Sequence, residues 1–389
     1  MTSSLRFWLG WGSGLALLLA LVVWGLLKWN LTNYTQFVAD RLMLLGELRR
    51  GAVQEYFSTA EAELRFWSTN PEILESQAYL GEIWGSEAGG AAAQQVRYSY
   101  AEGNPNPAGF YLNLDSAEDG TAYSELHGRM HPRTRLFVTE RGYYDFFLIG
   151  PEGDVFYTVE KERDFTTNLQ SGEWSNSGLA EVFTRAKRER KEATIAVSDM
   201  QAYAPSDGAP AIFMATAMHD DAGRFLGVIA FQLPTDRIMG IMNYTSGMGD
   251  TGETYLVGQD YLMRSDSRFS DESTVLSQVV QTPTVDLALA GKQGVKFIQD
   301  YRNVEVMSVY LPIQMGDTRW AVMAEIDRDE IEEGAARERP ALAGVLFFVY
   351  GLSLWSVWYW RGRQLPQDGV QLTGLDFSEG GDGGGGLDG

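Results

Sequence analysis

The sequence predicts an α+β protein in which two antiparallel-sheet modules follow a long N-terminal helix, with a transmembrane helix on either side. Three observations lead to this fold class. Paired strand-like runs joined by glycine-containing turns occur at two places along the 389 residues. A helical period of apolar residues precedes both pairs. An apolar stretch long enough to span a bilayer lies near each end of the chain.

Composition excludes several classes of function. Asp and Glu number 52 against 31 Lys and Arg, so the formal net charge of −21 would repel nucleic acid. The chain has no cysteine, which excludes disulfides, thiolate metal sites and a cysteine nucleophile. The metalloprotease, nucleophile-elbow, Walker and dinucleotide-binding motifs do not occur. We therefore predict a protein that is not an enzyme and holds no cofactor.

The two apolar stretches are predicted to be membrane spans. Residues 7–29 carry no charge before position 28, and residues 341–360 carry none. Arg6 precedes the first span and Arg361 and Arg363 follow the second, so the positive-inside rule places both termini in the cytoplasm. Neither span has a central ionisable residue, which argues against a pore, a proton relay or an axial ligand.

A long amphipathic helix is predicted after the first span, ending before Asn70-Pro71. Its apolar residues recur at helical spacing: Phe37, Leu42, Leu45, Leu48, Val53, Tyr56, Ala60, Leu64 and Trp67. We expect this apolar stripe to pack on the sheet modules of the same chain. The alternative is a seam against a second copy, which would make the protein a homodimer.

Loops and a basic helix follow. Residues 85–93 and 103–120 are rich in small or turn-forming residues and are predicted to be loops. Residues 121–140 have a helical pattern with a basic cluster along it: Arg129, His131, Arg133, Arg135 and Arg141. We expect these side chains to face solvent or to pair with nearby carboxylates; an anion site is the alternative.

The first sheet module opens with a hairpin whose strands, Tyr143–Ile149 and Asp154–Val159, flank a Gly-Pro-Glu-Gly turn. A helix is predicted over 178–191. Three further strands are predicted over 193–197, 211–218 and 226–233. A hairpin, a helix and then an antiparallel meander is the layout of a PAS-like sheet.

The second sheet module repeats this design in a shorter form. Its hairpin is predicted over Thr254–Arg264 and its helix over 282–290. The remaining strands are predicted over 295–298, 304–311 and 319–326, followed by a charged helix over 327–339. The resulting segments are 1–6 (cytoplasmic), 7–29 (span), 30–93 (helical stalk), 94–233 (membrane-distal module), 234–326 (membrane-proximal module), 327–340 (return helix), 341–360 (span) and 361–389 (Gly/Asp-rich cytoplasmic tail).

Several strings of residues resemble the double Cache family of extracytoplasmic sensor domains. They are Tyr143-Tyr144-Asp145, Lys161-Glu162-Arg163-Asp164-Phe165, Thr167-Asn168-Leu169, Tyr203-Ala204-Pro205-Ser206, the stretch from Gly249 to Gly258, and Arg264-Ser265-Asp266-Ser267-Arg268. The family occurs in bacterial chemoreceptors, sensor kinases and membrane cyclases. The resemblance covers about residues 31–339. It implies a distal module that binds a small molecule and helices that pass a small shift through the second span of a two-pass inner-membrane protein, with the sheet modules in the periplasm.

Two departures from the family limit what the resemblance implies. Receptors of this type continue into an output domain, whereas residues 362–389 are mostly Gly and Asp and are expected to be disordered alone. The amino-acid-sensing members place an Arg just before a Trp on the pocket strand, and Trp174 has no such Arg. Amino-acid binding is therefore not carried over to this chain.

The candidate ligand-binding residues lie on or beside the first hairpin, its following loop and the meander. They are Tyr144, Tyr157, Lys161, Asp164, Trp174, Tyr203 and Phe213. Lys161 would oppose a carboxylate ligand and Asp164 an amine. The alternative is that Tyr157 and Phe213 are ordinary core residues and that Lys161 and Asp164 form a surface pair. No metal site is predicted, because Arg264 and Arg268 are interleaved with the acidic group Asp266, Asp271 and Glu272.

Two functions fit these observations. The first is small-molecule sensing whose output lies in a separate membrane protein. The second is a structural accessory subunit of a larger membrane complex, for example a photosynthetic or respiratory one, that has reused a sensor fold.

Overall fold

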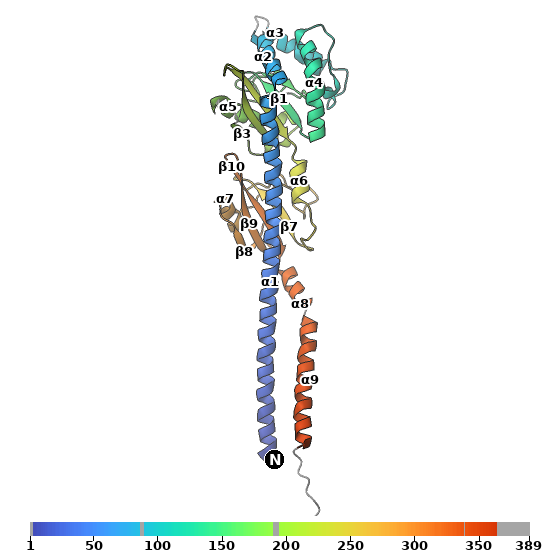
Figure 1. Cartoon of the computed structure of the whole chain (residues 1–389), viewed down its shortest axis with the longest axis vertical. Helices are drawn as coiled ribbons and strands as arrows, with labels where there is room; N and C mark the ends of the chain where they lie inside the picture. The colour runs from blue at the N-terminus through green and yellow to red at the C-terminus, as the bar shows by residue number, and fades with distance from the viewer. Residues whose placement is uncertain (1–2, 86–88, 190–193, 338, 364–389) are drawn as a thin grey trace, which may run out of the picture. The chain divides into compact units, whose positions relative to one another are not determined.

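The computed structural model describes residues 3–85, 89–189, 194–337 and 339–363 (Figure 1). Its contacts divide the chain into two compact units, one of residues 1–28 with 336–389 and one of residues 29–335. Both sheets belong to the second unit. In the first unit, the expected spans fall within the helices α1 (Ser3–Ser68) and α9 (Arg339–Arg363). Among the described residues, no helix combines the length and the apolar character that crossing a membrane requires. The predicted tail lies outside the described residues from position 364 onward.

Helix α1 confirms the predicted long helix and ends at Ser68. The side-chain oxygen of Asn70 then accepts hydrogen bonds from the backbone N–H groups of Glu72 and Ile73, which caps the next helix, α2 (Pro71–Gly85). One face of α1 is buried, with Leu42, Val53, Phe57, Ala60 and Leu64 in the main hydrophobic core. The predicted stripe is only partly covered, because Phe37 and Leu48 stay 60% and 57% exposed.

The remaining helices are α3 (Gly89–Arg97), α4 (Ala122–Arg141), α5 (Gly178–Glu189), α6 (Asp236–Met242), α7 (Pro283–Leu289) and α8 (Arg328–Arg337). Short turns of 3-10 or π type occur at Tyr98–Glu102, Tyr111–Asn113 and Ala204–Ser206. The loop predicted over 85–93 is wrong from Gly89 onward, because three consecutive alanines, strong helix formers, follow the two glycines of α3. Helix α6 was not predicted. Helix α4 begins at its Thr121 cap, as predicted.

The first module contains six strands: β1 (Asp145–Ile149), β2 (Val155–Thr158), β3 (Ile195–Val197), β4 (Gln201–Tyr203), β5 (Ala209–His219) and β6 (Phe225–Leu233). They form an antiparallel sheet in the order β2-β1-β6-β5-β3, with β4 paired to β5. Both faces are covered: Phe146 and Leu148 enter the core shared with α1, whereas Phe147 and Ile149 pack with α5. The predicted hairpin and meander are confirmed; β4, only three residues long, was missed.

The second module is an antiparallel sheet of four strands: β7 (Glu253–Val257), β8 (Gly294–Gln299), β9 (Glu305–Met315) and β10 (Thr318–Asp327). Their order is β7-β10-β9-β8. Helix α7 covers one face and α1 the other. Residues 261–264 turn back on β7 as the predicted hairpin requires, with a bridge between Val257 and Met263 and backbone hydrogen bonds from Gly258 N to the Leu262 oxygen and from Arg264 N to the Leu256 oxygen. They form isolated bridges and not the continuous strand that was predicted. The Arg264 side chain is buried and packs against the backbone at Gly258.

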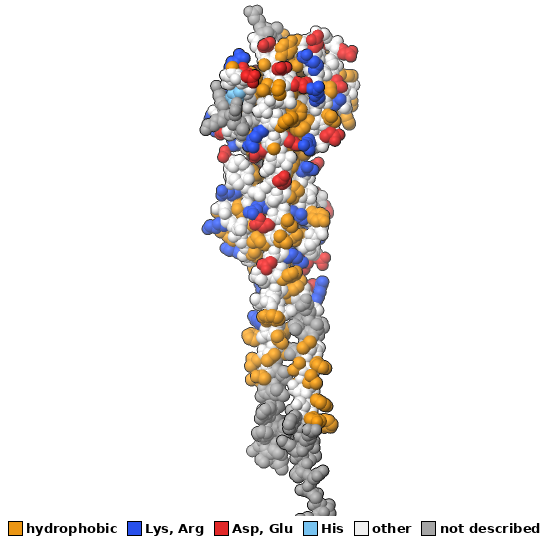
Figure 2. Space-filling model, viewed as in Figure 1, with side chains coloured by type: hydrophobic (Ala, Val, Ile, Leu, Met, Phe, Trp, Pro, Cys, Tyr) orange, Lys and Arg blue, Asp and Glu red, His pale blue; other side chains and the backbone are white. Residues whose placement is uncertain are grey.

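A loop residue of the first module makes a buried contact with the second. Asp199, between β3 and β4, accepts hydrogen bonds from the Arg264 guanidinium at 2.9 and 3.2 Å and from the Trp320 indole at 2.8 Å. Arg264 is 1% exposed and also pairs with Asp260. Nearer the surface, Arg185 of α5 pairs with Asp317, 2.7 Å away. On the face of the two sheet modules that Figure 2 displays, basic and acidic side chains are interspersed.

Candidate functional site

The first module contains an open cleft of about 700 Å³ beside the loop that follows β2. Its walls come from the end of α3, the irregular segment after it, the residue before β1 and the turn after β4. The lining residues are Arg97, Ala101, Glu102, Ala108, Gly109, Tyr111, Tyr144, Glu160, Lys161, Glu162, Arg163, Pro205 and Asp207. Most of these residues are charged, and Tyr111 and Tyr144 are the aromatic ones.

A buried carboxylate shapes the loop at the cleft. Asp145 Oδ1, at the start of β1, accepts hydrogen bonds from the backbone N–H groups of Phe146, Val159 and Glu160. Burial raises the pKa of Asp145 well above its usual range. The loop then turns sharply at Lys161, whose φ of 58° lies in the left-handed region. The fold thus fixes the backbone that carries the charged residues of the cleft.

Lys161 lies at the inner wall of the cleft and is almost fully buried. Its Nζ donates to the carbonyl oxygens of Thr158 and Val159 at 3.2 and 3.0 Å and lies 5.4 Å from the centre of the Tyr157 ring. Burial lowers the pKa of Lys161 to about 7. The amine is therefore directed into the protein and is only partly charged at neutral pH.

Two glutamates beside Lys161 differ in their partners. Glu162 accepts hydrogen bonds from the hydroxyls of Tyr144 and Ser206 at 2.6 and 2.5 Å. Glu160 lines the cleft, and no described side chain donates a hydrogen bond to it or pairs with it. Burial, followed by repulsion from Glu162, raises the pKa of Glu160 to about 7. Glu160 is therefore the acidic group of the cleft that is left to meet a ligand.

The arginines of the cleft are held by groups of the protein. Arg97 donates to the carbonyl oxygen of Phe165 at 2.5 Å and pairs with Glu102. Arg163 donates to the carbonyl oxygen of Ala204 and pairs with Asp207. Since both guanidiniums are engaged, the cleft favours a cationic ligand over an anionic one.

The candidate residues from sequence fall into two groups. Tyr144 and Lys161 line the cleft. Asp164 and Tyr203 lie behind it as a buried pair, with the Tyr203 hydroxyl donating to Asp164 Oδ2 at 2.5 Å. Burial raises the pKa of Asp164 to about 7. Lys161 and Asp164 are both buried and do not form the surface pair considered above.

The other three candidates also lie outside the cleft lining. The Tyr157 hydroxyl contacts His131 Nδ1 and Thr134 Oγ1, each at 2.6 Å, inside the core. The Phe213 ring packs edge-on against Tyr203 in the core beside α5. The Trp174 indole contacts the carbonyl oxygen of Arg163 at 3.4 Å.

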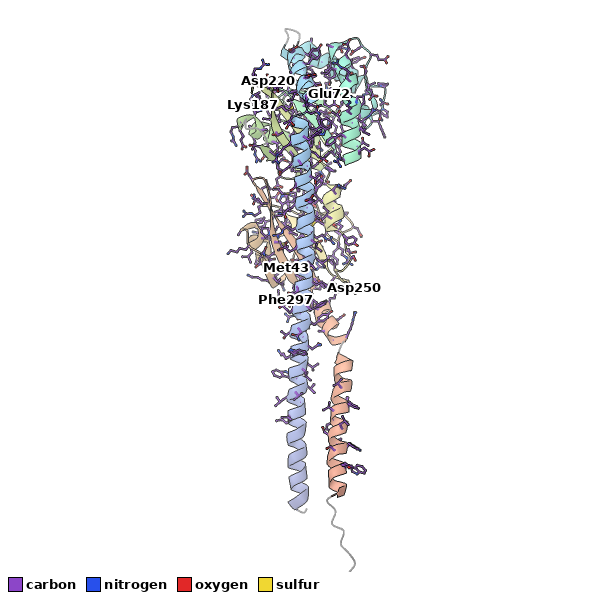
Figure 3. All side chains as sticks on the ribbon, in the orientation of Figure 1. Met43, Glu72, Lys187, Asp220, Asp250 and Phe297 are labelled. Atoms are coloured by element: carbon purple, nitrogen blue, oxygen red, sulfur yellow. The ribbon has the colours of Figure 1, made fainter. Side chains whose placement is uncertain are left out.

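The basic cluster on α4 is divided among separate partners. Arg133 pairs with Glu72 of α2, a residue labelled in Figure 3. Arg135 pairs with Asp115 and Arg141 with Glu63. His131 is buried and stacked on His127, with ring centres 4.3 Å apart. Arg133, Arg135 and Arg141 match the expected pairing with carboxylates, whereas His131 does not, because it is buried and contacts the Tyr157 hydroxyl and the Leu112 carbonyl oxygen.

Sequence reasoning missed several residues of the cleft, Glu160 and Tyr111 among them. Glu160 immediately precedes the Lys161–Phe165 string, so its neighbourhood was marked in the sequence. The sequence could not show that Glu160 lacks a side-chain partner among the described residues, because such partners come from segments distant along the chain. Tyr111 lies in a segment predicted only as loop.

The chain is similar to known sensor domains in sequence and in structure. A family model described as the Cache domain, of the double Cache type, matches residues 53–335. The sensory domain of the Campylobacter jejuni chemoreceptor Tlp3 is 12% identical, with 78% of this chain and 99% of that one covered and a TM-score of 0.45. The ligand-binding domain of the Pseudomonas fluorescens chemoreceptor CtaA in complex with L-leucine is 12% identical, with 79% and 99% covered and a TM-score of 0.40. A search of curated proteins found no match.

Proposed function

Because this chain belongs to the Cache domain family, whose model matches residues 53–335, we propose that it is a non-enzymatic sensor whose first module binds a small molecule in the cleft. The ligand class that fits is a small cationic amine. The observation that carries this proposal is Glu160, a largely buried carboxylate that lines the cleft without a side-chain partner among the described residues. An ammonium group would neutralise it, and the rings of Tyr111 and Tyr144 would add cation–π attraction.

The experiment compares matched ligands on the full chain in detergent. Thermal unfolding is followed with a panel of small primary amines and with their uncharged N-acetyl counterparts. We expect at least one amine to raise the Tm by several degrees while its N-acetyl form does not. Glu160→Gln should lose the shift, and Glu189→Gln, a change at an exposed position on α5, should keep it. Shifts that are equal in wild type and Glu160→Gln would refute the site.

We also propose that residues 7–29 and 341–360 anchor the protein in a bacterial inner membrane, with residues 30–340 outside the cytoplasm. Their apolar composition and the flanking arginines support this topology. The absence of native cysteine allows a clean test. A membrane-impermeant maleimide added to intact cells should label Glu272→Cys, which is exposed, whereas Ser378→Cys should react only after lysis. The reverse pattern would refute the topology.

We propose that two copies of this chain form a homodimer and that the homodimer passes its signal to a separate membrane protein. Phe37, Leu44 and Leu48 are 60%, 59% and 57% exposed and recur at seven- and four-residue steps on α1, which supports a helix seam between two copies. Oxidation should cross-link Leu44→Cys between chains and leave Glu82→Cys, on α2, uncross-linked. Gentle extraction and mass spectrometry would identify co-purifying chains. A fixed-stoichiometry complex that is insensitive to amines would favour the accessory-subunit function instead.

A further inference from the structure

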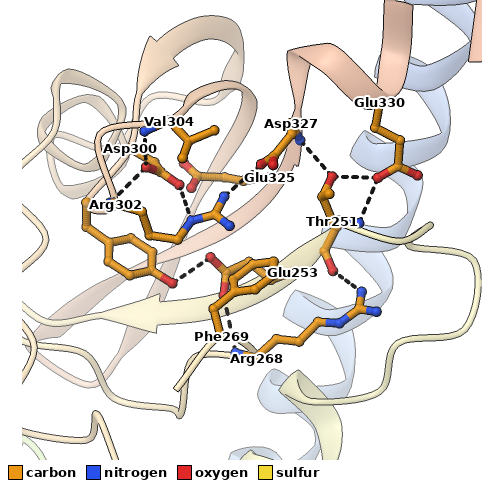
Figure 4. Close-up of polar contacts among 12 residues, drawn as sticks. Thr251, Glu253, Arg268, Phe269, Asp300, Arg302, Val304, Glu325, Asp327 and Glu330 are labelled. Carbon is orange, nitrogen blue, oxygen red and sulfur yellow. Dashed lines mark hydrogen bonds and ion pairs between the residues drawn. The ribbon is translucent and has the colours of Figure 1, made fainter. Parts of the chain in front are cut away.

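The second module contains a cluster of three buried carboxylates (Figure 4). Glu253 begins β7, Glu325 lies on β10, and Asp300 lies in the turn between β8 and β9. One oxygen from each residue lies within 4.8 Å of the other two. We call these residues the carboxylate cluster.

The cluster has more negative than positive charge. Arg302 donates to Asp300 Oδ2 at 2.7 Å and to Asp327 Oδ1 at 2.8 Å, and its guanidinium stacks 4.0 Å from the centre of the Phe269 ring. The other nearby arginine, Arg268, directs its guanidinium to the carbonyl oxygens of Gly249 and Gly252. Arg302 is therefore the guanidinium bound within this set of carboxylates. Unpaired buried charge is costly, so the surplus needs a partner.

Hydrogen bonds satisfy the cluster incompletely. Glu253 accepts from the Tyr301 hydroxyl at 2.8 Å, the Ser267 hydroxyl at 3.1 Å and the Arg268 backbone N–H at 3.3 Å. Asp300 Oδ1 accepts from the backbone N–H groups of Arg302 and Val304.

Glu325 is the least satisfied member. Its Oε2 accepts from the Tyr255 hydroxyl at 2.9 Å. The Ser308 hydroxyl donates to Thr284 at 3.1 Å and also lies close enough to the Glu325 carboxyl to lower its pKa, against the larger rise to about 7 that burial causes. Glu325 Oε1 is fully buried and has no hydrogen-bond partner among the described residues. A bound cation would satisfy this oxygen, which has no donor among the described residues and lies in contact range of two further carboxylates.

The first module provides an internal comparison. In the sheet register, Asp145 at the start of β1 lies opposite Gln232 of β6, a carboxylate facing a neutral amide. At the equivalent place in the second module, Glu253 at the start of β7 lies opposite Glu325 of β10. Like charges directly opposite each other on neighbouring strands are destabilising. The second module thus has a second carboxylate where the first has none.

We propose that the carboxylate cluster binds one hard divalent cation, and that calcium fits it. Carboxylate oxygens are the preferred ligands of calcium, at about 2.3–2.6 Å, and three oxygens within 4.8 Å of one another can share one such ion. Calcium accepts irregular geometry, whereas magnesium demands near-octahedral coordination and retains water, for which this buried cluster is poorly suited. The ion would join β7, β10 and the β8–β9 turn. The proposal is independent of the amine cleft in the first module.

The experiment measures calcium binding to the full chain in detergent after treatment with chelator. Equilibrium dialysis should find one calcium ion per wild-type chain, and calcium should raise the Tm. Glu325→Gln, which recreates the carboxylate–amide pair of the first module, should weaken binding at least tenfold and lose the Tm shift. Glu333→Gln, at an exposed position on α8, should behave as wild type. Terbium luminescence excited through Tyr255 and Tyr301 should report binding at the cluster itself.

Three results would overturn the proposal. The first is wild-type protein that binds no calcium. The second is Glu325→Gln protein that binds calcium as tightly as wild type, which places the ion elsewhere. The third is a wild-type Tm that calcium does not change, together with a Glu325→Gln variant whose Tm is equal or higher. This pair of results would show that a proton occupies the cluster. If Glu325→Gln fails to fold, the terbium signal of the wild type and its loss in Glu253→Gln decide the question.

Discussion

The two modules share one plan and use its acidic position differently. Each begins its first strand with a buried carboxylate, Asp145 in β1 and Glu253 in β7. Asp145 is satisfied on one oxygen by three backbone N–H groups and so organises the loop at an open cleft. Glu253 is surrounded by side chains from the turns of its own module, including Tyr301 and Ser267. The same kind of sheet therefore borders an open cleft in one module and an enclosed polar cluster in the other.

Arg264→Ala is expected to lower the free energy of unfolding most. It tests whether the second module depends on its buried contact with the first. Arg264 is 1% exposed and pairs with Asp199 of the first module. Loss of this buried guanidinium removes its packing and leaves Asp199 unneutralised, so we expect the free energy of unfolding to fall by about 3 kcal/mol. Urea denaturation of the full chain measures the loss. Arg224→Ala, which removes an exposed ion pair in a turn, is the control. Equal stability of the two variants would show that the joint is not structural.

Tyr203→Phe tests the buried polar pair of the first module. The change removes the hydroxyl that donates to Asp164 Oδ2. The other carboxylate oxygen, Asp164 Oδ1, already has no hydrogen-bond partner among the described residues. We expect a loss of about 2 kcal/mol, since a buried carboxylate is left without its donor. Tyr261→Phe removes an exposed hydroxyl contact to Asp286 in the second module and should leave stability unchanged. If Tyr203→Phe reduces the free energy of unfolding no more than Tyr261→Phe does, the hydrogen bond from Tyr203 to Asp164 does not stabilise the first module.

The pH dependence of stability should distinguish the cleft from the rest of the first module. The pKa of Glu160 is raised from 4.5 to about 7 in the folded chain, so between these values the folded state holds a proton that the unfolded state has released. Its contribution to stability is therefore present below about pH 4.5 and is lost as the pH rises toward 7. Glu160→Gln cannot titrate, so it should lose less stability than wild type between pH 5 and pH 7.5. The difference should be on the order of 1 kcal/mol, since solvent in the cleft screens the charge. Glu189→Gln should follow the wild-type curve in the same urea titrations.

Asp317→Ala should have the smallest effect. Asp317 is 85% exposed, although its pair with Arg185 connects the same two modules as Asp199 and Arg264. We expect the free energy of unfolding to change by less than about 0.5 kcal/mol, since exposed ion pairs contribute little. A loss as large as that of Arg264→Ala would mean that the surface contact, and not the buried one, couples the modules.

The sequence predicted the elements whose signals are local. The Gly-Pro-Glu-Gly turn marked the first hairpin, and Asn70-Pro71 marked the end of the long helix. The second hairpin turns back as predicted, although its second arm forms isolated bridges and not a strand. The ion pair of Arg264 with Asp199 was not predicted, because Asp199 lies far away in the chain. The failure at α3 shows that an alanine run outweighs neighbouring glycines.

The candidate site was predicted less well than the fold. Tyr144 and Lys161 were found from their positions beside the hairpin. Asp164 was chosen for its charge, but the structure gives it Tyr203 as a partner and leaves Glu160 facing the cleft. The opposition of Glu253 and Glu325 depends on the register between β7 and β10, which composition and spacing do not reveal.

The contact of Asp199 with both Arg264 and Trp320 has a consequence for protein engineering and for evolution. A chimera that transplants β7–β10 onto a foreign upstream half would leave the Trp320 indole without its Asp199 acceptor, and would leave the buried Arg264 guanidinium with Asp260 but without Asp199. The recipient would have to supply an acceptor at the matching loop position. Recombination between relatives should therefore succeed when the crossover keeps that loop and the downstream half together, so the pair is inherited as a single cassette.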